Sequence, residues 1–191
     1  MLIPGLGRVT EDAETGSYVS EPVAVPVLGN APCTVTLEDY DDDPDPEQVR
    51  AAVRAFLAAD ESVLRAAEPH VFHYYQDCRR DGFTGLRIRS PGDVWRHVQF
   101  GNQAIVGRQP GSRHVYVSVE CECGWEEEHG LQLVFEDGSR VSKVGPFDGH
   151  LTNANAYGDA RFQDVVYVGA DSLAPLGEAP PPERKRWWKF W

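Results

Sequence analysis

The sequence predicts a single α+β domain, with helices in the first half and a mainly antiparallel sheet with a hairpin in the second half. Apolar residues recur at helical spacing between about residues 46 and 98, and they alternate at strand spacing from residue 103 onward. Helices grouped before strands are typical of α+β domains. Because 41% of the 191 residues are hydrophobic, one core can form, and we expect it within residues 1–177.

The first 37 residues predict short strands separated by turns. The segment from Pro22 to Leu28 is apolar but contains two prolines, so we expect it at the edge of a sheet. Residues 33–37, Cys-Thr-Val-Thr-Leu, alternate with the period of a strand.

Three helices are expected next. The first begins at Asp45, whose carboxylate can accept free N–H groups and which precedes a proline suited to the first helical position. A second helix is expected over residues 62–77, where Pro69 must kink or split it. A third, short helix opens at Ser90, again before a proline.

The second half predicts a sheet. Residues 115–123 alternate between apolar and polar side chains and indicate a long strand. The runs 131–135 and 140–144 flank Glu-Asp-Gly-Ser, and an Asp-Gly pair between alternating runs is typical of a hairpin. We expect a final strand over residues 163–168.

Charge and cysteine content narrow the function classes. Thirty acidic and 18 basic side chains give a net charge of −12, which disfavours double-stranded nucleic acid as a partner because phosphates are repelled. The start of the chain lacks a basic segment followed by an apolar run, so no signal peptide is predicted. Four unevenly spaced cysteines do not suggest a disulfide framework. We therefore expect a cytoplasmic protein with reduced thiols.

One motif carries a resemblance. Residues 123–131 read Cys-Gly-Trp-Glu-Glu-Glu-His-Gly-Leu, followed by Asp-Gly-His at 148–150. Over about residues 22–170 the chain resembles a bacterial domain-of-unknown-function family, numbered 6985, with a C-x-W-x-x-E-H-G-L signature. The resemblance implies a small cytoplasmic α+β protein without an established activity. Some members resemble immunity-type proteins that neutralise the toxins of neighbouring bacteria.

A structural interpretation of the motif gives each residue a role in folding. Trp125 is expected to anchor the core while its indole N–H finds one acceptor. Glu128 and His129 would hold the entry to a strand through hydrogen bonds with the backbone. Gly130 would allow a positive φ.

A catalytic interpretation groups Glu128 and His129 with Asp148 and His150, because the loop after the hairpin can return toward the motif. A histidine beside carboxylates can act as a general base or bind a metal, so the alternative function is a small metal-dependent hydrolase. None of the common catalytic motifs accompanies these residues.

Zinc is a further alternative. Its four weak candidate ligands are Cys121, Cys123, His129 and His150, and the two cysteines share one face of a strand. A C-x-C pair lacks the usual knuckle spacing, and buried cysteines on a strand are commonly part of a core. We therefore expect no cofactor.

Two segments are candidates for partner binding. Seven of the ten residues 38–47 are acidic, and Asp41, Asp42 and Asp43 form either a solvated loop or a surface for a basic partner. Residues 178–191 form a proline-rich linker and a tail with a net charge of +2, whereas residues 1–177 carry −14. The tail's aromatic candidates are Trp187, Trp188, Phe190 and Trp191.

These features favour a non-enzymatic, immunity-like module that binds a protein. An exposed basic and aromatic segment is typical of an interaction site. Peripheral contact between the tail and a membrane is an alternative, because tryptophan and basic side chains favour the membrane interface.

Overall fold

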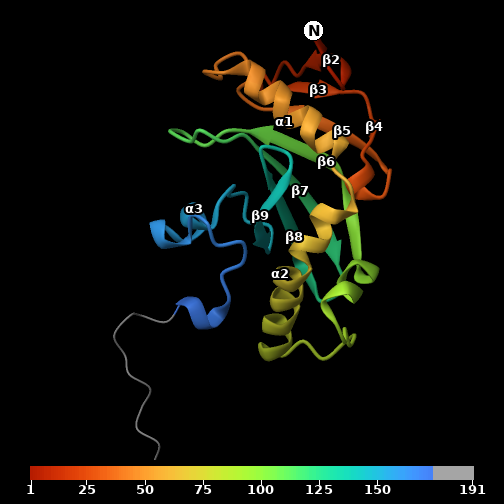
Figure 1. Ribbon diagram of the computed structural model, residues 1–191, viewed down its shortest axis with the longest axis vertical. Coiled ribbons are helices and arrows are strands. Elements are labelled where there is room, and N and C mark those ends of the chain that lie inside the picture. Colours follow the sequence, from red (N-terminus) through yellow and green to blue (C-terminus); the bar gives the residue numbers. More distant parts are fainter. Residues whose placement is uncertain (174–191) are drawn as a thin grey trace, which may run out of the picture.

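A computed structural model describes residues 1–173 and is built on a nine-stranded sheet (Figure 1). The strand order is β1-β2-β3-β5-β6-β7-β8-β9, and β4 pairs with β5 outside this path. Every neighbouring pair is antiparallel except β5 and β6, which are parallel. The strands are β1 (Leu2–Ile3), β2 (Gly7–Glu11), β3 (Tyr18–Ser20), β4 (Val23–Ala24), β5 (Pro32–Leu37), β6 (Val98–Gly107), β7 (Tyr116–Cys123), β8 (Glu126–Glu136) and β9 (Arg140–Gly145).

The predicted fold class is wrong. Strands begin at Leu2, β1 to β5 precede the first α-helix, and one mixed sheet runs through both halves of the chain. Short strands in the first 37 residues were predicted, but segments of two to five residues carry no signal that they join the later strands in one sheet. The parallel pairing of β5 with β6 also leaves no signal in a short stretch of sequence, because parallel strands are joined by a long crossover connection and so lie far apart in the chain.

The three α-helices follow β5, and the 3-10 helices are spread along the chain. They are α1 (Pro46–Ala58), α2 (Glu61–Arg80) and the short α3 (Asn153–Tyr157), together with the 3-10 helices η1 (Pro26–Leu28), η2 (Pro91–His97), η3 (Ala160–Phe162) and η4 (Ala170–Leu173). The predicted start of α1 is confirmed, since the Asp45 side chain accepts a hydrogen bond from the N–H of Gln48. Helix α2 contains Pro69 but is not split by it.

The hairpin between β8 and β9 is confirmed, with Asp137 and Gly138 at positive φ in the turn. The predicted strand over residues 163–168 is wrong. This segment instead runs beside the edge of β9, where the N–H of Val144 donates to the carbonyl of Val166 at 2.7 Å. A single ladder contact does not make a strand.

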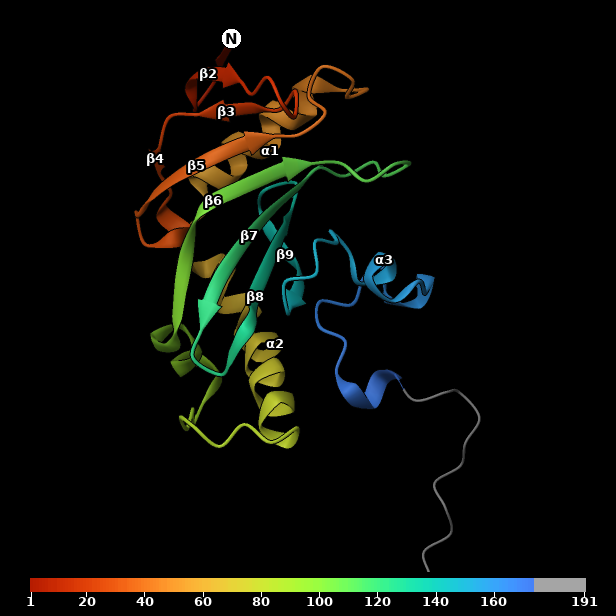
Figure 2. The same ribbon diagram turned by 180° about the vertical axis from the view of Figure 1, so that it is seen from behind.

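The two faces of the sheet differ. Helices α1 and α2 cover one face (Figure 1) and bury a core in which Phe56 of α1 packs edge-on against Phe135 of β8, with ring centroids 5.2 Å apart. Turning the molecule by 180° shows β5 to β8 with no helix over them (Figure 2). We call this second side the open face.

Among residues 1–173, no helix is both long and apolar enough to cross a bilayer.

Candidate functional site

A trough of about 1040 Å³ lies on the open face, across β6, β7 and the turn into β8. Strand alternation supplies its floor. In β7 the side chains of Val117, Val119 and Cys121 enter the core. The positions between them, Ser118 and Glu120, therefore face the other way and line the trough.

The strand register brings polar side chains together across this floor. Gln99 of β6 pairs with Glu122 of β7, and Ile105 pairs with Ser118. The pairing shifts between Phe100 and Ala104. Gly101 lies in this irregular stretch, where a Cβ atom would collide with the carbonyl oxygen of Glu120. A glycine is therefore required for β6 to approach β7 this closely.

The trough carries mostly negative charge. Three basic or imidazole side chains, Arg96, His97 and His129, also line it. The five lining glutamates are Glu120, Glu122, Glu126, Glu127 and Glu128. Glu120, Glu122, Glu127 and Glu128 are exposed, so their charges face solvent and any approaching partner.

The signature motif forms one rim of this trough. Glu126 accepts hydrogen bonds from the N–H groups of Glu128 at 2.9 Å and His129 at 2.7 Å. The carboxylate that holds the strand entry is thus that of Glu126, two residues before the expected Glu128. The side chains of Glu128 and His129 are exposed. Gly130 has φ +61°, and a Cβ atom there would collide with the carbonyl oxygen of Cys121.

Trp125 fixes this rim to the helical layer. Its ring is buried and meets Tyr74 and Tyr75 of α2 edge-on, with centroids 6.2 and 6.0 Å apart. Its indole nitrogen has no hydrogen-bond partner within residues 1–173, in contrast to the expected acceptor. The hydroxyl of Tyr74 instead donates to the carbonyl of Gly130 at 3.0 Å, so α2 positions the rim directly.

The proposed catalytic residues lie in neighbouring loops but do not form one cluster. The N–H of Phe147 donates to the carbonyl of His129 at 3.0 Å, which places the two loops side by side. The His129 ring faces Glu126 at 3.4 Å, whereas His150 lies 3.4 Å from Asp148. In the described part of the chain, no three of Glu128, His129, Asp148 and His150 form a compact metal-binding group.

Asp148 has a different partner. Its carboxylate accepts a hydrogen bond at 2.6 Å from Lys143, whose side chain is almost fully buried. Lys143 also donates to Gln132 at 2.5 Å, and Gln132 donates to Ser118 at 2.9 Å. Burial lowers the pKa of Lys143, and the bond to Asp148 opposes this shift. Asp148 therefore serves as the counter-ion of a buried lysine.

Within residues 1–173, no three of the four candidate zinc ligands form a compact metal-binding group either. Cys121 and Cys123 are buried in the core, where burial raises the pKa of their thiols to about 12 and about 11. His129 and His150 are exposed. A high thiol pKa disfavours the thiolate that zinc requires.

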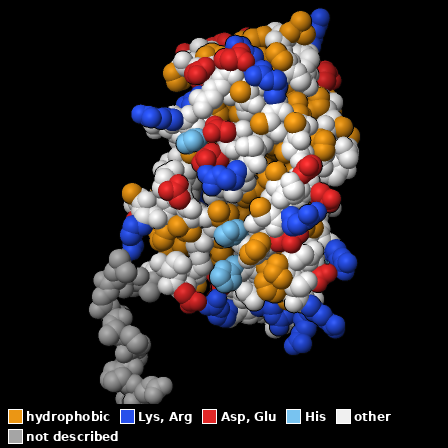
Figure 3. Space-filling view, in the orientation of Figure 1, with side chains coloured by type: hydrophobic (Ala, Val, Ile, Leu, Met, Phe, Trp, Pro, Cys, Tyr) orange, Lys and Arg blue, Asp and Glu red, His pale blue; other side chains and the backbone are white. Residues whose placement is uncertain are grey.

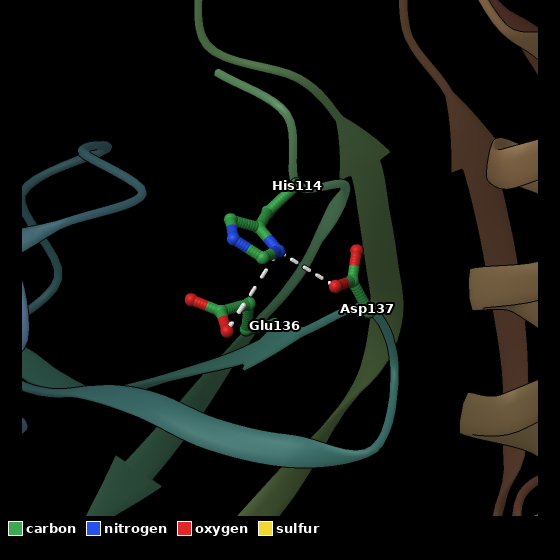
Figure 4. Close-up of side chains that lie close together, drawn as sticks. All are labelled: His114, Glu136 and Asp137. Atoms are coloured by element: carbon green, nitrogen blue, oxygen red, sulfur yellow. Dashed lines mark hydrogen bonds and ion pairs between the residues drawn. The ribbon is translucent and has the colours of Figure 1, made fainter.

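Sequence analysis missed a different cluster, formed by His114, Glu136 and Asp137 (Figure 4). The Nδ1 atom of His114 lies 2.7 Å from a carboxylate oxygen of Asp137 and 3.8 Å from one of Glu136. Asp137 also accepts the N–H of Val115 at 3.0 Å, and Glu136 pairs with Arg140 at 2.5 Å. These bonds hold the start of β7 to the hairpin turn, and an Asp at the turn opposite a His was the available sequence signal.

The predicted partner-binding aspartates differ in whether their carboxylates are already paired within the protein. Asp43 forms an ion pair with Arg108 at 3.0 Å, and both side chains are at most 10% exposed. Burial alone would raise the pKa of Asp43, but hydrogen bonds from Arg108 and the N–H of Asp45 hold it below its usual value. The carboxylate of Asp41 accepts a hydrogen bond from the hydroxyl of Tyr18 at 2.8 Å. Asp42 is exposed.

The tail residues Trp187, Trp188, Phe190 and Trp191 lie outside the described residues.

Comparison with known proteins identifies one family. The family model described as "Domain of unknown function (DUF6985)" matches residues 5–151, which confirms the expected family over a range that begins and ends earlier than the expected 22–170. The "Replication gene A protein" of Escherichia phage 186 is 33% identical over 76 residues, covering 35% of this chain and 10% of that protein. This chain therefore spans about a tenth of the length of that relative. No solved structure is significantly similar.

Proposed function

The chain belongs to the DUF6985 family, and from this premise we propose that it is a non-enzymatic binding module that holds a basic protein partner in the acidic trough. The observation that carries this proposal is the set of exposed glutamates on the paired strands β7 and β8, around an open cavity of about 1040 Å³. Clustered negative charge raises the rate of association with positive surfaces.

The trough offers more than charge. Gln99 and Gln103 are exposed amides that can donate and accept hydrogen bonds, while Ile105 and Phe147 add apolar surface. Its walls are strands, so the groups that would contact a partner are held in place before binding. A preorganised surface loses less conformational entropy when a complex forms.

The proposal includes a cytoplasmic, immunity-like role, in which the basic partner is a toxin. The match to the phage replication protein is too short to support a replication role. The hydrolase alternative has no supporting observation, because His129 pairs with Glu126, His150 pairs with Asp148, and within residues 1–173 no three of the proposed catalytic residues form a compact group.

An affinity pull-down from native lysate tests this proposal. The full chain, a chain truncated after Gly177, and the double variant Glu120→Gln/Glu122→Gln serve as baits. We expect the first two to enrich the same protein and the double variant to lose it. The matched control is Glu11→Gln/Glu14→Gln, which removes two exposed glutamates outside the trough.

Other outcomes assign the function elsewhere. Enrichment by the full chain alone would place recognition on residues 178–191 and overturn the role of the trough. Retention of the partner by Glu120→Gln/Glu122→Gln would do the same. Binding of the full chain to anionic vesicles, lost on truncation, would support the membrane alternative for the tail.

A further inference from the structure

A second hollow, of about 520 Å³, lies at the C-terminal half of α2 and has the opposite charge to the trough. Four of its lining residues are arginines, although residues 1–177 carry 14 basic and 28 acidic side chains. Lys and Arg side chains gather around this end of the molecule in the lower part of Figure 3. We call this hollow the arginine pocket; its lining residues are Phe72, Tyr75, Gln76, Arg79, Arg80, Arg87, Ile88 and Arg89.

The outer wall of the arginine pocket is an extended segment fixed to α2. The N–H of Ile88 donates to the hydroxyl of Tyr75 at 3.0 Å, and a guanidinium nitrogen of Arg79 donates to the carbonyl of Leu86 at 3.2 Å. Ile88 is buried, at 7% exposed, and Arg87 and Arg89 on either side of it are exposed. In an extended chain, these two arginines point to the same side.

The four arginines are not equivalent. The guanidinium of Arg79 donates to the carbonyl of Leu86 and lies 6.0 Å from the centroid of the Tyr75 ring. Arg80 forms ion pairs with Asp77 and Asp171. Within residues 1–173, Arg87 and Arg89 have no carboxylate within 4.0 Å, so their guanidinium groups are available to a ligand.

The floor of the arginine pocket is apolar. The rings of Phe72 and Tyr75 lie 5.7 Å apart, and because Tyr75 and Ile88 are buried, the half-buried Phe72 supplies the apolar surface that a ligand can reach. A lone phosphate is best held by donors that converge on one point. Two separate guanidinium groups beside an apolar floor instead match two carboxylates that flank an apolar side chain.

We propose that the arginine pocket binds an acidic segment of a partner protein, with carboxylates on Arg87 and Arg89 and an apolar side chain against Phe72. This interaction surface is separate from the acidic trough and does not depend on the function proposed for it. The protein then presents two docking sites of opposite charge.

Isothermal titration of the full chain with the peptide acetyl-Glu-Asp-Phe-Glu-Asp-amide tests this inference. We expect saturable binding that weakens about tenfold, or about 1.4 kcal/mol, in Arg87→Gln/Arg89→Gln, because the variant loses two exposed charge pairs. The matched control is Arg8→Gln/Arg113→Gln, which removes two exposed arginines elsewhere and should bind like the parent protein. A peptide with Ser in place of Phe should bind more weakly.

Three results would overturn the inference. Equal binding by the parent protein and Arg87→Gln/Arg89→Gln would exclude the two arginines, and an equal loss in the control would show nonspecific attraction. Displacement of the peptide by sodium phosphate, but not by sodium chloride of the same ionic strength, would indicate a simple anion site. The trough variant Glu120→Gln/Glu122→Gln should leave this titration unchanged, so the two proposals fail separately.

Discussion

The covered and open faces of the central strands carry different information. On the covered face, Val117, Val119 and Leu133 are fully buried and determine how α1 and α2 pack. On the open face, the alternate positions hold Ser118 and Glu120. Of these positions in β7, Ser118 is buried and accepts a hydrogen bond from Gln132, whereas Glu120 and Glu122 are exposed. The comparison teaches that one strand can specify the fold with its buried positions and leave its exposed ones to recognition. Substitutions on the two faces should therefore separate stability from binding.

The largest expected effect is on the covered face. Phe135→Ala removes a ring that is fully buried and packed against Phe56, and it should lower the free energy of unfolding by about 3–5 kcal/mol. The matched substitution on the open face, Glu120→Ala, should change it by less than about 0.5 kcal/mol. Urea denaturation measures both. Equal losses would show that the open face is part of the folding core.

A smaller loss is expected at the rim that joins the two faces. Gly130→Ala must accept a positive φ and a collision with the carbonyl of Cys121, so we expect a loss of about 2–3 kcal/mol. Gly149→Ala is the control, because Gly149 also has a positive φ but no atom near its absent Cβ. The Gly149→Ala variant should lose only about 1 kcal/mol of its free energy of unfolding. Thermal denaturation of both variants checks this difference.

The next effect distinguishes two neighbouring glutamates of the signature turn. Glu126→Ala removes the acceptor of two N–H groups and should lower stability by about 1–2 kcal/mol. Glu128→Ala and His129→Ala remove exposed side chains and should change it by less than about 0.5 kcal/mol. If Glu128→Ala proved the more damaging substitution in urea denaturation, the assignment of the turn to Glu126 would be wrong.

The smallest expected effect is a pH dependence of stability that comes from buried thiols on the covered face. Burial raises the pKa of Cys33 to about 11, of Cys121 to about 12 and of Cys123 to about 11, from an ordinary value of 9. Folding favours the protonated thiols. Their contribution to the free energy of unfolding is therefore complete below pH 9, and it is lost as the pH rises through 11 to 12. At pH 9 the loss should be roughly a few tenths of a kcal/mol per thiol.

Urea denaturation between pH 8 and 9.5 measures this slope. The variant Cys123→Ala should show a shallower fall than the parent protein, because one of the raised thiols is absent. An identical slope in both proteins would mean that other groups cause the alkaline loss.

Local signals explain which features could be predicted from the sequence. The cap at Asp45, the Asp-Gly hairpin and the alternation of residues 115–123 all depend on neighbours in the chain, and each matches the structure. The parallel pairing of β5 with β6 could not be predicted, because the residues between Leu37 and Val98 carry no mark of it.

The candidate site was predictable in part. The motif residues Trp125 and Gly130 lie at the rim of the trough. The alternation of residues 115–123 already placed Glu120 and Glu122 on the polar side of a strand. Their role as the floor of a trough depends on the absence of a helix over that side, which is a property of the whole fold. The arginine pocket likewise requires α2 and residues 86–89 to meet.

The parallel pair also sets an order of events during synthesis. Strand β5 leaves the ribosome before its partner β6, and the 60 residues from Glu38 to His97 separate them. A newly made β5 therefore waits with one unpaired edge, while β6 to β9 can pair through short connections as soon as they appear. The joining of β5 to β6 is then the late, slow step that unites the two ends of the sheet.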